Sequence, residues 1–410
     1  MKNKTIDIKF IIASLSLAIL TYVVFRAINL SITHDEAFTY TRYVNHTYAE
    51  IVTYQTGSIL PNNHILNTVC QKFFSEIFGP HEFVLRLGNI LCCIVFLSVS
   101  YCFCRQFTGI IALASFVILT MHPYVLDFMG LSRGYGMAFT FMLLSLFCFF
   151  RSIKKEFNPG DFSLGLLAAV LAIWANFSLL NYLLVVSPLF LLMQIIFSNR
   201  QTRPDWLRRF ILNTGSFIVS CLVLRIIIYG PLKIILDRKL LFGGEKGFWS
   251  DTVISLCERL GYGANYQHYW IIFLQVLILV ILIGAFVQII YTIRTRRRDA
   301  SDLFLLFLFL LTLGLSLASI AQFHFMGSYF PKERLALSFI PPFMLLINFL
   351  FKSIDLNQGK KIAVLNLFPM LLAIVFLTHM LFSANVTYVL DWKYDANTKA
   401  IALDIEAIND

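Results

Sequence analysis

The sequence predicts an all-α, polytopic membrane protein, and its composition and its long apolar runs are the observations that predict it. The 410 residues are 58% hydrophobic and only 14% charged, and the mean hydropathy is +0.76. A soluble globular chain is typically about 45–50% apolar and about 25% charged. The composition therefore disfavours a soluble enzyme, a disordered chain and a nucleic-acid-binding protein.

Long apolar runs predict the individual spans, because a membrane-spanning helix needs about 20 mostly apolar residues. Eleven such runs occur, at about 10–30, 84–104, 108–128, 134–150, 162–178, 180–198, 210–229, 270–293, 302–321, 335–351 and 362–383. The runs at 162–178 and 180–198 are either one kinked pair or two separate spans. The first run has no small-residue cleavage site, so we expect it to remain as the first span.

The distribution of charge predicts the orientation, because cytoplasmic loops are enriched in Lys and Arg. With the N-terminus inside, the inner segments are 2–9, 105, 151–155, 200–209, 294–298 and 352–361, and with their flanks they hold 18 basic and seven acidic residues. The rest of the chain holds 15 basic and 16 acidic residues. We therefore expect a cytoplasmic N-terminus, and eleven spans place the C-terminus outside.

The long connecting segments are expected on the outer face, at about 31–83, 230–269, 322–334 and 384–410. The inner loops are short and basic, and the sequence lacks a phosphate-binding GxxxxGK[ST] loop or a GxGxxG turn after a strand. These observations disfavour an ATP-driven pump and a nucleotide-sugar enzyme with a cytoplasmic domain. The eight cysteines show no pair of CxxC motifs and no Cys/His zinc spacing. Any chemistry is thus expected outside.

Two adjacent carboxylates, Asp35 and Glu36, follow the first run directly. A partly desolvated carboxylate at the membrane surface can act as a general base or bind a cation. The alternative is a solvated helix start, because Thr33 is a good N-cap and acidic residues stabilise a helix N-terminus. Both interpretations stay open at this point.

The same outer segment holds two further polar pairs. Asn63 and His64 open a predicted amphipathic helix after a Gly/Ser-containing loop. Glu82 and Arg86 are four residues apart, so on one helix face they would form a salt bridge.

Cationic residues mark two later positions. Arg133 precedes the fourth apolar run, where an arginine needs an anionic partner, such as a lipid headgroup, or a route to water. Lys332 and Arg334 precede the tenth run and, as paired cations, could hold a phosphate. The alternative for this pair is a charged loop that anchors a helix end.

In order and topology, these clusters resemble the motifs of the GT-C superfamily of integral-membrane glycosyltransferases, in particular the protein-O-mannosyltransferase and lipid A aminoarabinose transferase group. The resemblance covers about residues 10–350 and departs from the pattern at Ile65, where proline is usual, and at Leu335, where tyrosine often stands. The motif residues are Asp35-Glu36, Asn62-Asn63-His64-Ile65-Leu66, Glu82 with Arg86-Leu87, Ser132-Arg133-Gly134-Tyr135 and Pro331-Lys332-Glu333-Arg334.

The resemblance implies a hexosyl- or pentosyltransferase of the cell envelope, embedded in the inner membrane with an extracytoplasmic active site. Its donor would be a polyprenyl-phosphate-linked sugar, and its acceptor a protein, a lipid or a glycan. Asp35 would be the catalytic base, with Glu36 supporting it or helping to hold a cation. The residues implied in donor and phosphate binding are Arg133, Tyr135, Lys332 and Arg334, and those implied in orienting the substrate are Asn63 and His64. No cofactor is assigned, and a divalent metal held near His64 is the less favoured alternative.

The expected organisation is a transmembrane GT-C-like domain at 1–383 and a short extracytoplasmic tail at 384–410, too short for a core of its own. Its partners would be the donor, the acceptor and membrane lipids, without nucleic acid. The alternative function is a transporter or flippase of lipid-linked glycans, which would bind phosphate with the same cations and need no general base. A membrane scaffold is a third possibility, and it would tolerate loss of the Asp35 carboxylate.

The charge distribution makes the first testable prediction. A cysteine introduced in the 243–247 loop should react with a membrane-impermeant thiol reagent added from outside, and a cysteine near Arg296 should react only after permeabilisation. The parent chain, labelled in parallel, corrects for the eight native cysteines. The reverse labelling pattern would contradict both the orientation and the outer location of the site.

Overall fold

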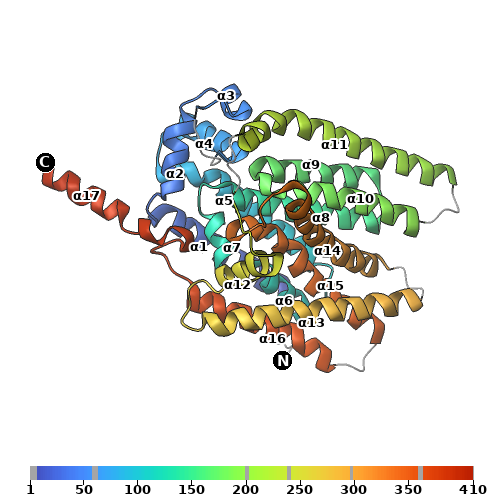
Figure 1. Ribbon diagram of the computed structural model, residues 1–410. Coiled ribbons are helices and arrows are strands. Elements are labelled where there is room, and N and C mark those ends of the chain that lie inside the picture. The colour runs from blue at the N-terminus through green and yellow to red at the C-terminus, as the bar shows by residue number, and fades with distance from the viewer. Residues whose placement is uncertain are drawn as a thin grey trace.

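The computed structural model is a helical bundle with its short helices gathered at one end (Figure 1). It describes residues 7–57, 63–198, 203–237, 242–295, 299–358 and 363–409. Within these ranges there is no β-strand, and a single antiparallel bridge joins Gly244 to Phe330. The predicted all-α class is therefore confirmed.

The elements follow one another in a simple order. The first half of the chain forms α1 (Ile8–Asn29), α2 (His34–Thr39), η1 (Tyr40–Val44), α3 (Tyr48–Thr53), α4 (Ile65–Phe78), α5 (Glu82–Cys104), α6 (Gly109–Thr120), α7 (Pro123–Met129), α8 (Gly134–Lys154), α9 (Pro159–Ala175), η2 (Phe177–Leu179) and α10 (Leu180–Phe197). The second half forms α11 (Arg203–Asp237), η3 (Phe248–Ile254), α12 (Ser255–Leu260), α13 (Gln267–Arg294), α14 (Ala300–Met326), η4 (Glu333–Phe339), α15 (Ile340–Gln358), α16 (Ala363–Ser383), η6 (Leu390–Asp395) and α17 (Thr398–Asn409).

The long helices make the chain an integral membrane protein. Among the described residues, eight helices are long and apolar enough to cross a membrane, and the bent pair α6 and α7 would make a ninth. α9 and the Leu367–Ser383 part of α16 are apolar but shorter. Every predicted run thus contains a helix. The predicted count of eleven spans is not confirmed, because only eight or nine of these described helices are long and apolar enough to cross a membrane. The short predicted helices of the 31–83 segment are present as α2, α3 and α4.

The predicted run at 108–128 is broken rather than continuous. α6 ends at Thr120, α7 begins at Pro123, and the two axes differ by 66°. Proline has no N–H to donate and disfavours helical backbone in the residue before it, so the hydrogen-bond ladder stops here. The break turns α7 toward the end of the bundle where the short helices lie.

Two glycines let α8 start in close contact with its neighbours. A Cβ atom at Gly134 would lie 2.0 Å from the carbonyl oxygen of Ala175, and one at Gly136 would lie 2.3 Å from that of Phe128. No other residue type fits at these positions without moving backbone. The glycines therefore fix the position of Arg133, the N-cap residue of α8.

The segment after α16 packs back onto the bundle. Tyr22 in α1 donates a hydrogen bond to the carbonyl of Asn385 at 3.0 Å, and the Ser31 hydroxyl donates to the carbonyl of Ala396 at 2.9 Å. α17 then projects away from the other helices (Figure 1). The predicted tail at 384–410 therefore begins as part of the folded bundle.

Candidate active site

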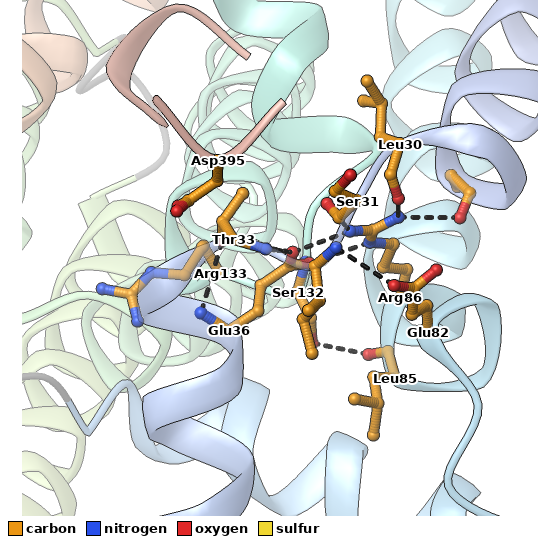
Figure 2. A network of polar contacts seen from close by, with 12 residues as sticks. Leu30, Ser31, Thr33, Glu36, Glu82, Leu85, Arg86, Ser132, Arg133 and Asp395 are labelled. Carbon is orange, nitrogen blue, oxygen red and sulfur yellow. Dashed lines mark hydrogen bonds and ion pairs between the residues drawn. The ribbon is translucent and has the colours of Figure 1, made fainter. Parts of the chain in front are cut away.

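A buried ion pair between Glu36 and Arg86 joins α2 to α5. Arg86 donates from Nε and Nη2 to the two carboxylate oxygens of Glu36, at 2.9 and 2.8 Å. Its other N–H groups donate to the backbone carbonyls of Ala27, Leu30 and Ser31, at 2.9, 2.9 and 3.0 Å. Figure 2 shows the guanidinium between the Glu36 carboxylate and these carbonyls. All five guanidinium donors are therefore used.

Glu36 also closes the start of α2. Its Oε2 atom accepts hydrogen bonds from the backbone N–H and hydroxyl of Thr33 at 3.0 and 3.1 Å, and the Thr33 hydroxyl in turn accepts from the N–H of Glu36. This reciprocal arrangement is a capping box, so Thr33 is the N-cap that one of the two interpretations expected, but this helix start is buried and not solvated. The Oε1 atom of Glu36 accepts a hydrogen bond from the N–H of Ser132 at 2.6 Å. Both oxygens are thus occupied by protein groups.

These contacts keep Glu36 ionised. Burial by itself would raise the pKa of Glu36, but the Arg86 charge and the hydrogen bonds from Thr33 and Ser132 hold that pKa below its ordinary value. An ionised carboxylate with both oxygens engaged positions its neighbours and is not free to take a proton.

The predicted salt bridge between Glu82 and Arg86 is wrong. Glu82 instead accepts a hydrogen bond from the N–H of Ile32 at 3.1 Å and pairs with Lys399 at 2.8 Å. Arg86 lies in the core, where a charge is stable only with a closely matched partner, and Glu36 provides one. The spacing of four residues between Glu82 and Arg86 says nothing about Glu36, because Glu36 belongs to a different helix, α2.

The turn before α8 is held by a second polar network. The Ser132 hydroxyl donates to the carbonyl of Leu85 at 2.5 Å and accepts from Gln71 Nε2 at 2.6 Å. Asn67 Nδ2 donates to the Ser132 carbonyl at 3.0 Å. Side chains of α4 therefore hold the backbone from which Arg133 extends.

Asp35 lies between two arginines. Its Oδ2 atom lies 3.2 Å from Arg133 Nη2 and 3.6 Å from Arg334 Nη2. Among the described residues, this atom accepts no hydrogen bond, although it is shielded from solvent. The Arg133 side chain is 1% exposed and that of Arg334 is 33% exposed. Of the two cations beside Asp35, Arg334 is therefore the accessible one.

The buried Arg133 is held by α2. Its Nη1 atom donates to the Thr39 hydroxyl at 3.2 Å and to the Asp35 carbonyl at 3.4 Å. Burial lowers the pKa of Arg133, and the Asp35 carboxylate opposes that shift. The sequence interpretation that an arginine here needs an anionic partner is confirmed, and the partner is Asp35.

A second set of charges adjoins Asp35. Asp391 lies 3.8 Å from Arg334 and 3.3 Å from Arg259, and Arg259 lies 2.9 Å from Glu333. Burial raises the pKa of Asp391, while the charges of Arg259 and Arg334 oppose that shift. The cluster thus balances three arginines against three carboxylates, with Asp35 and Asp391 both next to Arg334.

Aromatic rings surround the Arg334 guanidinium. Its carbon lies 4.8 Å from the centroid of the Trp392 ring and 5.8 Å from that of Tyr135, which are cation–π distances. The His64 ring meets Tyr135 edge-on at 4.9 Å, and its Nδ1 lies 3.1 Å from the Ala175 carbonyl. Burial lowers the pKa of His64 well below its ordinary value, so the ring is neutral and donates from Nδ1.

Two predicted site residues, Asn63 and Lys332, have other surroundings. Asn63 is buried, donates to the Ile51 carbonyl at 3.2 Å and accepts from the Thr68 hydroxyl at 2.8 Å, so it shapes the start of α4. Lys332 makes no ion pair with the residues that the structure describes. Asn62 of the predicted motif lies outside the described residues.

An apolar cavity of about 120 Å³ lies next to the helix that carries Arg259. α12 contributes Leu256, Cys257 and Leu260, which flank Arg259, and the start of α15 contributes Ile340, six residues after Arg334. Residues of η3, α13, α14 and η4 complete the wall. The cavity therefore connects helices that cross the membrane with elements that carry the charges.

No metal site is evident in the part of the chain that the structure describes. Within it, no three His, Cys, Asp or Glu side chains are grouped to hold an ion. A divalent metal accordingly keeps no assigned ligands.

The sequence analysis missed Asp391, Trp392 and, as a site residue, Arg259. A signal for the first two existed, because the tail carries the polar and aromatic stretch Asp391-Trp392-Lys393-Tyr394-Asp395 soon after the last apolar run, which ends at 383. Nothing in the sequence marks Arg259, because its partners come from η4 and η6.

No family model matches this sequence, and no curated protein matches it. Among solved structures, the chain is similar to ArnT from Cupriavidus metallidurans bound to undecaprenyl phosphate, with a TM-score of 0.44 and 14% identity, over 94% of this chain and 74% of that one. It is also similar to the arabinosyltransferase EmbB from Mycobacterium smegmatis, with a TM-score of 0.49 and 10% identity, over 94% of this chain and 41% of that one. Since both TM-scores lie below 0.5, the function has to be argued from the site itself.

The buried pair makes a stability prediction. Arg86→Ala would leave the Glu36 carboxylate buried without its partner, and breaking such a pair typically costs about 3–5 kcal/mol. We expect a clear fall in the unfolding temperature of the purified protein in detergent, whereas Arg105→Ala, which removes an exposed arginine, should change it little. Equal unfolding temperatures for the two variants would contradict this role.

The same pair predicts how stability depends on pH. The folded-state pKa of Glu36 is lowered, so its contribution is fully present above the unfolded value of about 4.3 and is lost as the pH falls through the folded value. The parent should therefore lose stability between these two pH values more steeply than Glu36→Gln does. Parallel unfolding curves for the two proteins would contradict this.

Proposed function

We propose that this chain transfers a sugar from a polyprenyl-phosphate donor to an acceptor on the extracytoplasmic face of the membrane. The observation that carries the proposal is Asp35, a carboxylate whose Oδ2 atom accepts no hydrogen bond from the described residues and lies beside the partly exposed Arg334. Such a transfer needs a base for the acceptor, a cation for the leaving phosphate and an apolar site for the lipid. This end of the bundle offers candidates for all three.

Asp35 is suited to be the general base. As the acceptor oxygen or nitrogen attacks the anomeric carbon, its proton passes to the Asp35 carboxylate. The bond between the anomeric carbon and the phosphate oxygen breaks, and its electron pair remains on that oxygen. Removal of a proton by a positioned carboxylate typically contributes about 10²–10⁴-fold to the rate.

Arg334 is suited to stabilise the leaving phosphate, because its guanidinium is partly exposed and lies within 3.6 Å of the base. Charge-assisted contacts strengthen as negative charge develops on the phosphate. Lys332, two residues earlier, would add positive charge on the same loop. Arg133 has a different part, since its buried guanidinium holds the Asp35 carboxylate in place.

The apolar cavity is suited to a segment of the lipid chain of the donor. Leu256, Cys257 and Leu260 of α12, the helix that carries Arg259, belong to its wall, so a lipid seated there would have its phosphate near this helix. Its walls come from α12 to α15, which include candidate membrane spans. A lipid-linked donor also fits the lack of a nucleotide-binding motif in the sequence.

The catalytic role of Asp35 is tested by Asp35→Asn, which keeps the shape of the side chain and removes its charge and basicity. We expect sugar transfer from a labelled polyprenyl-phosphate sugar to fall by about 10²–10⁴-fold while donor binding persists. Asp404→Asn, in the exposed helix α17, is the matched control.

A flippase would behave differently in the same assay. It would still move the lipid-linked sugar across the membrane after Asp35→Asn, because phosphate recognition depends on the cations. Near-normal transfer by this variant would exclude Asp35 as the base.

The phosphate role of Arg334 is tested by Arg334→Ala. Loss of a charge-assisted contact is worth about 1.5–3 kcal/mol, so the Kd for the polyprenyl-phosphate donor should rise by about 10–150-fold. Binding is measured in nanodiscs, with Arg105→Ala as the matched control. An unchanged Kd would mean that Arg334 only anchors the start of α15.

A further inference from the structure

The C-terminal segment at 385–399 is built into the site by tethers along its length. Arg26 donates to the Tyr388 carbonyl at 2.8 Å, and Asp127 accepts from the N–H of Leu390 at 3.1 Å. Asp395 accepts from the N–H of His34 at 2.7 Å, next to Asp35. Figure 2 shows Asp395 close to the start of α2. Residues 391 and 392 are thus fixed between two sets of tethers.

Asp391 meets a cation on either side. Its side chain is only 4% exposed and lies between Arg259 at 3.3 Å and Arg334 at 3.8 Å. The Tyr124 hydroxyl donates a hydrogen bond to Asp391 Oδ2 at 2.9 Å, which orients the carboxylate. A buried carboxylate held in this way is a fixed negative charge facing Arg334.

Arg334 is therefore shared between two carboxylates. Asp35 attracts it at 3.6 Å from one side, and Asp391 attracts it at 3.8 Å from the other. The Trp392 ring, 4.8 Å away, supports the guanidinium face. If the pull of Asp391 were absent, Coulomb attraction would draw the arginine toward Asp35. Arg334 would then neutralise the base and turn away from an incoming phosphate.

We infer that Asp391 and Trp392 are positioning residues, which hold Arg334 off Asp35 and direct it toward the phosphate of the donor. The inference rests on the proposed function for its ligand, a polyprenyl phosphate. It assigns a role in the reaction to a segment that the sequence presents only as a tail. In this role, neither Asp391 nor Trp392 contacts the reacting atoms.

A double-mutant cycle on phosphate binding tests this coupling. Groups that act on one another give non-additive effects, whereas independent groups give additive ones. Asp391→Asn should raise the Kd for polyprenyl phosphate by about tenfold in the parent chain and by less than about twofold in an Arg334→Ala background. Lys399→Gln removes another tether of the same segment, its pair with Glu82, and should leave the Kd unchanged. Equal effects of Asp391→Asn in both backgrounds would overturn the inference.

The Trp392 arm keeps the test valid even if Asp391→Asn does not fold. Trp392→Phe retains a ring under the guanidinium and should bind polyprenyl phosphate nearly as the parent does, whereas Trp392→Leu should bind it several-fold more weakly. Equal binding by the two variants would overturn the part assigned to Trp392.

A cryo-EM structure of Asp391→Asn separates this inference from the proposed function. We expect the Arg334 guanidinium to leave Trp392 and approach Asp35, and an unmoved guanidinium would refute the positioning role. If the parent chain binds no polyprenyl phosphate, the proposed function fails, and the position of Arg334 in this variant still decides the inference.

Discussion

The buried pair of Glu36 and Arg86 is the interaction on which the rest of the site depends. It binds the end of α1, the start of α2, the body of α5 and the turn before α8 into one unit. Either charge alone in this place would cost several kcal/mol, so the segments must assemble together. Consecutive helical residues differ by about 100° in direction. When Glu36 points into the core, its neighbour Asp35 consequently points toward Arg133 and Arg334.

The charged cluster is balanced before any ligand arrives. Asp35, Asp391 and Glu333 offset the three arginines around them, which lets buried cations persist without a bound anion. A phosphate that reaches Arg334 competes with Asp35 for the same guanidinium. In the proposed reaction, phosphate capture and the release of the base are therefore linked through one side chain.

Local chemistry in the sequence predicted a good part of this arrangement. Thr33 and Glu36 mark the start of α2, and the order of acidic and basic clusters predicted that they would meet at one end. Partners that are distant in the chain could not be predicted, because no spacing connects Glu36 to Arg86 or Asp391 to Arg334. The bend at Pro123 was not predicted either. An apolar run shows only that a segment is long and apolar enough to span the membrane, whereas the bend is caused by a single residue that has no N–H to donate.

The most direct test of glycosyl transfer follows the label of a donor in sealed vesicles that contain only the purified chain. The donor carries a radiolabelled sugar on a polyprenyl phosphate, and candidate acceptors are supplied on the face that holds the 243–247 loop. If the chain is a glycosyltransferase, the label moves to the acceptor and an equal amount of free polyprenyl phosphate appears. If the label crosses the membrane while still attached to its lipid, the chain is a flippase and the proposed reaction is wrong.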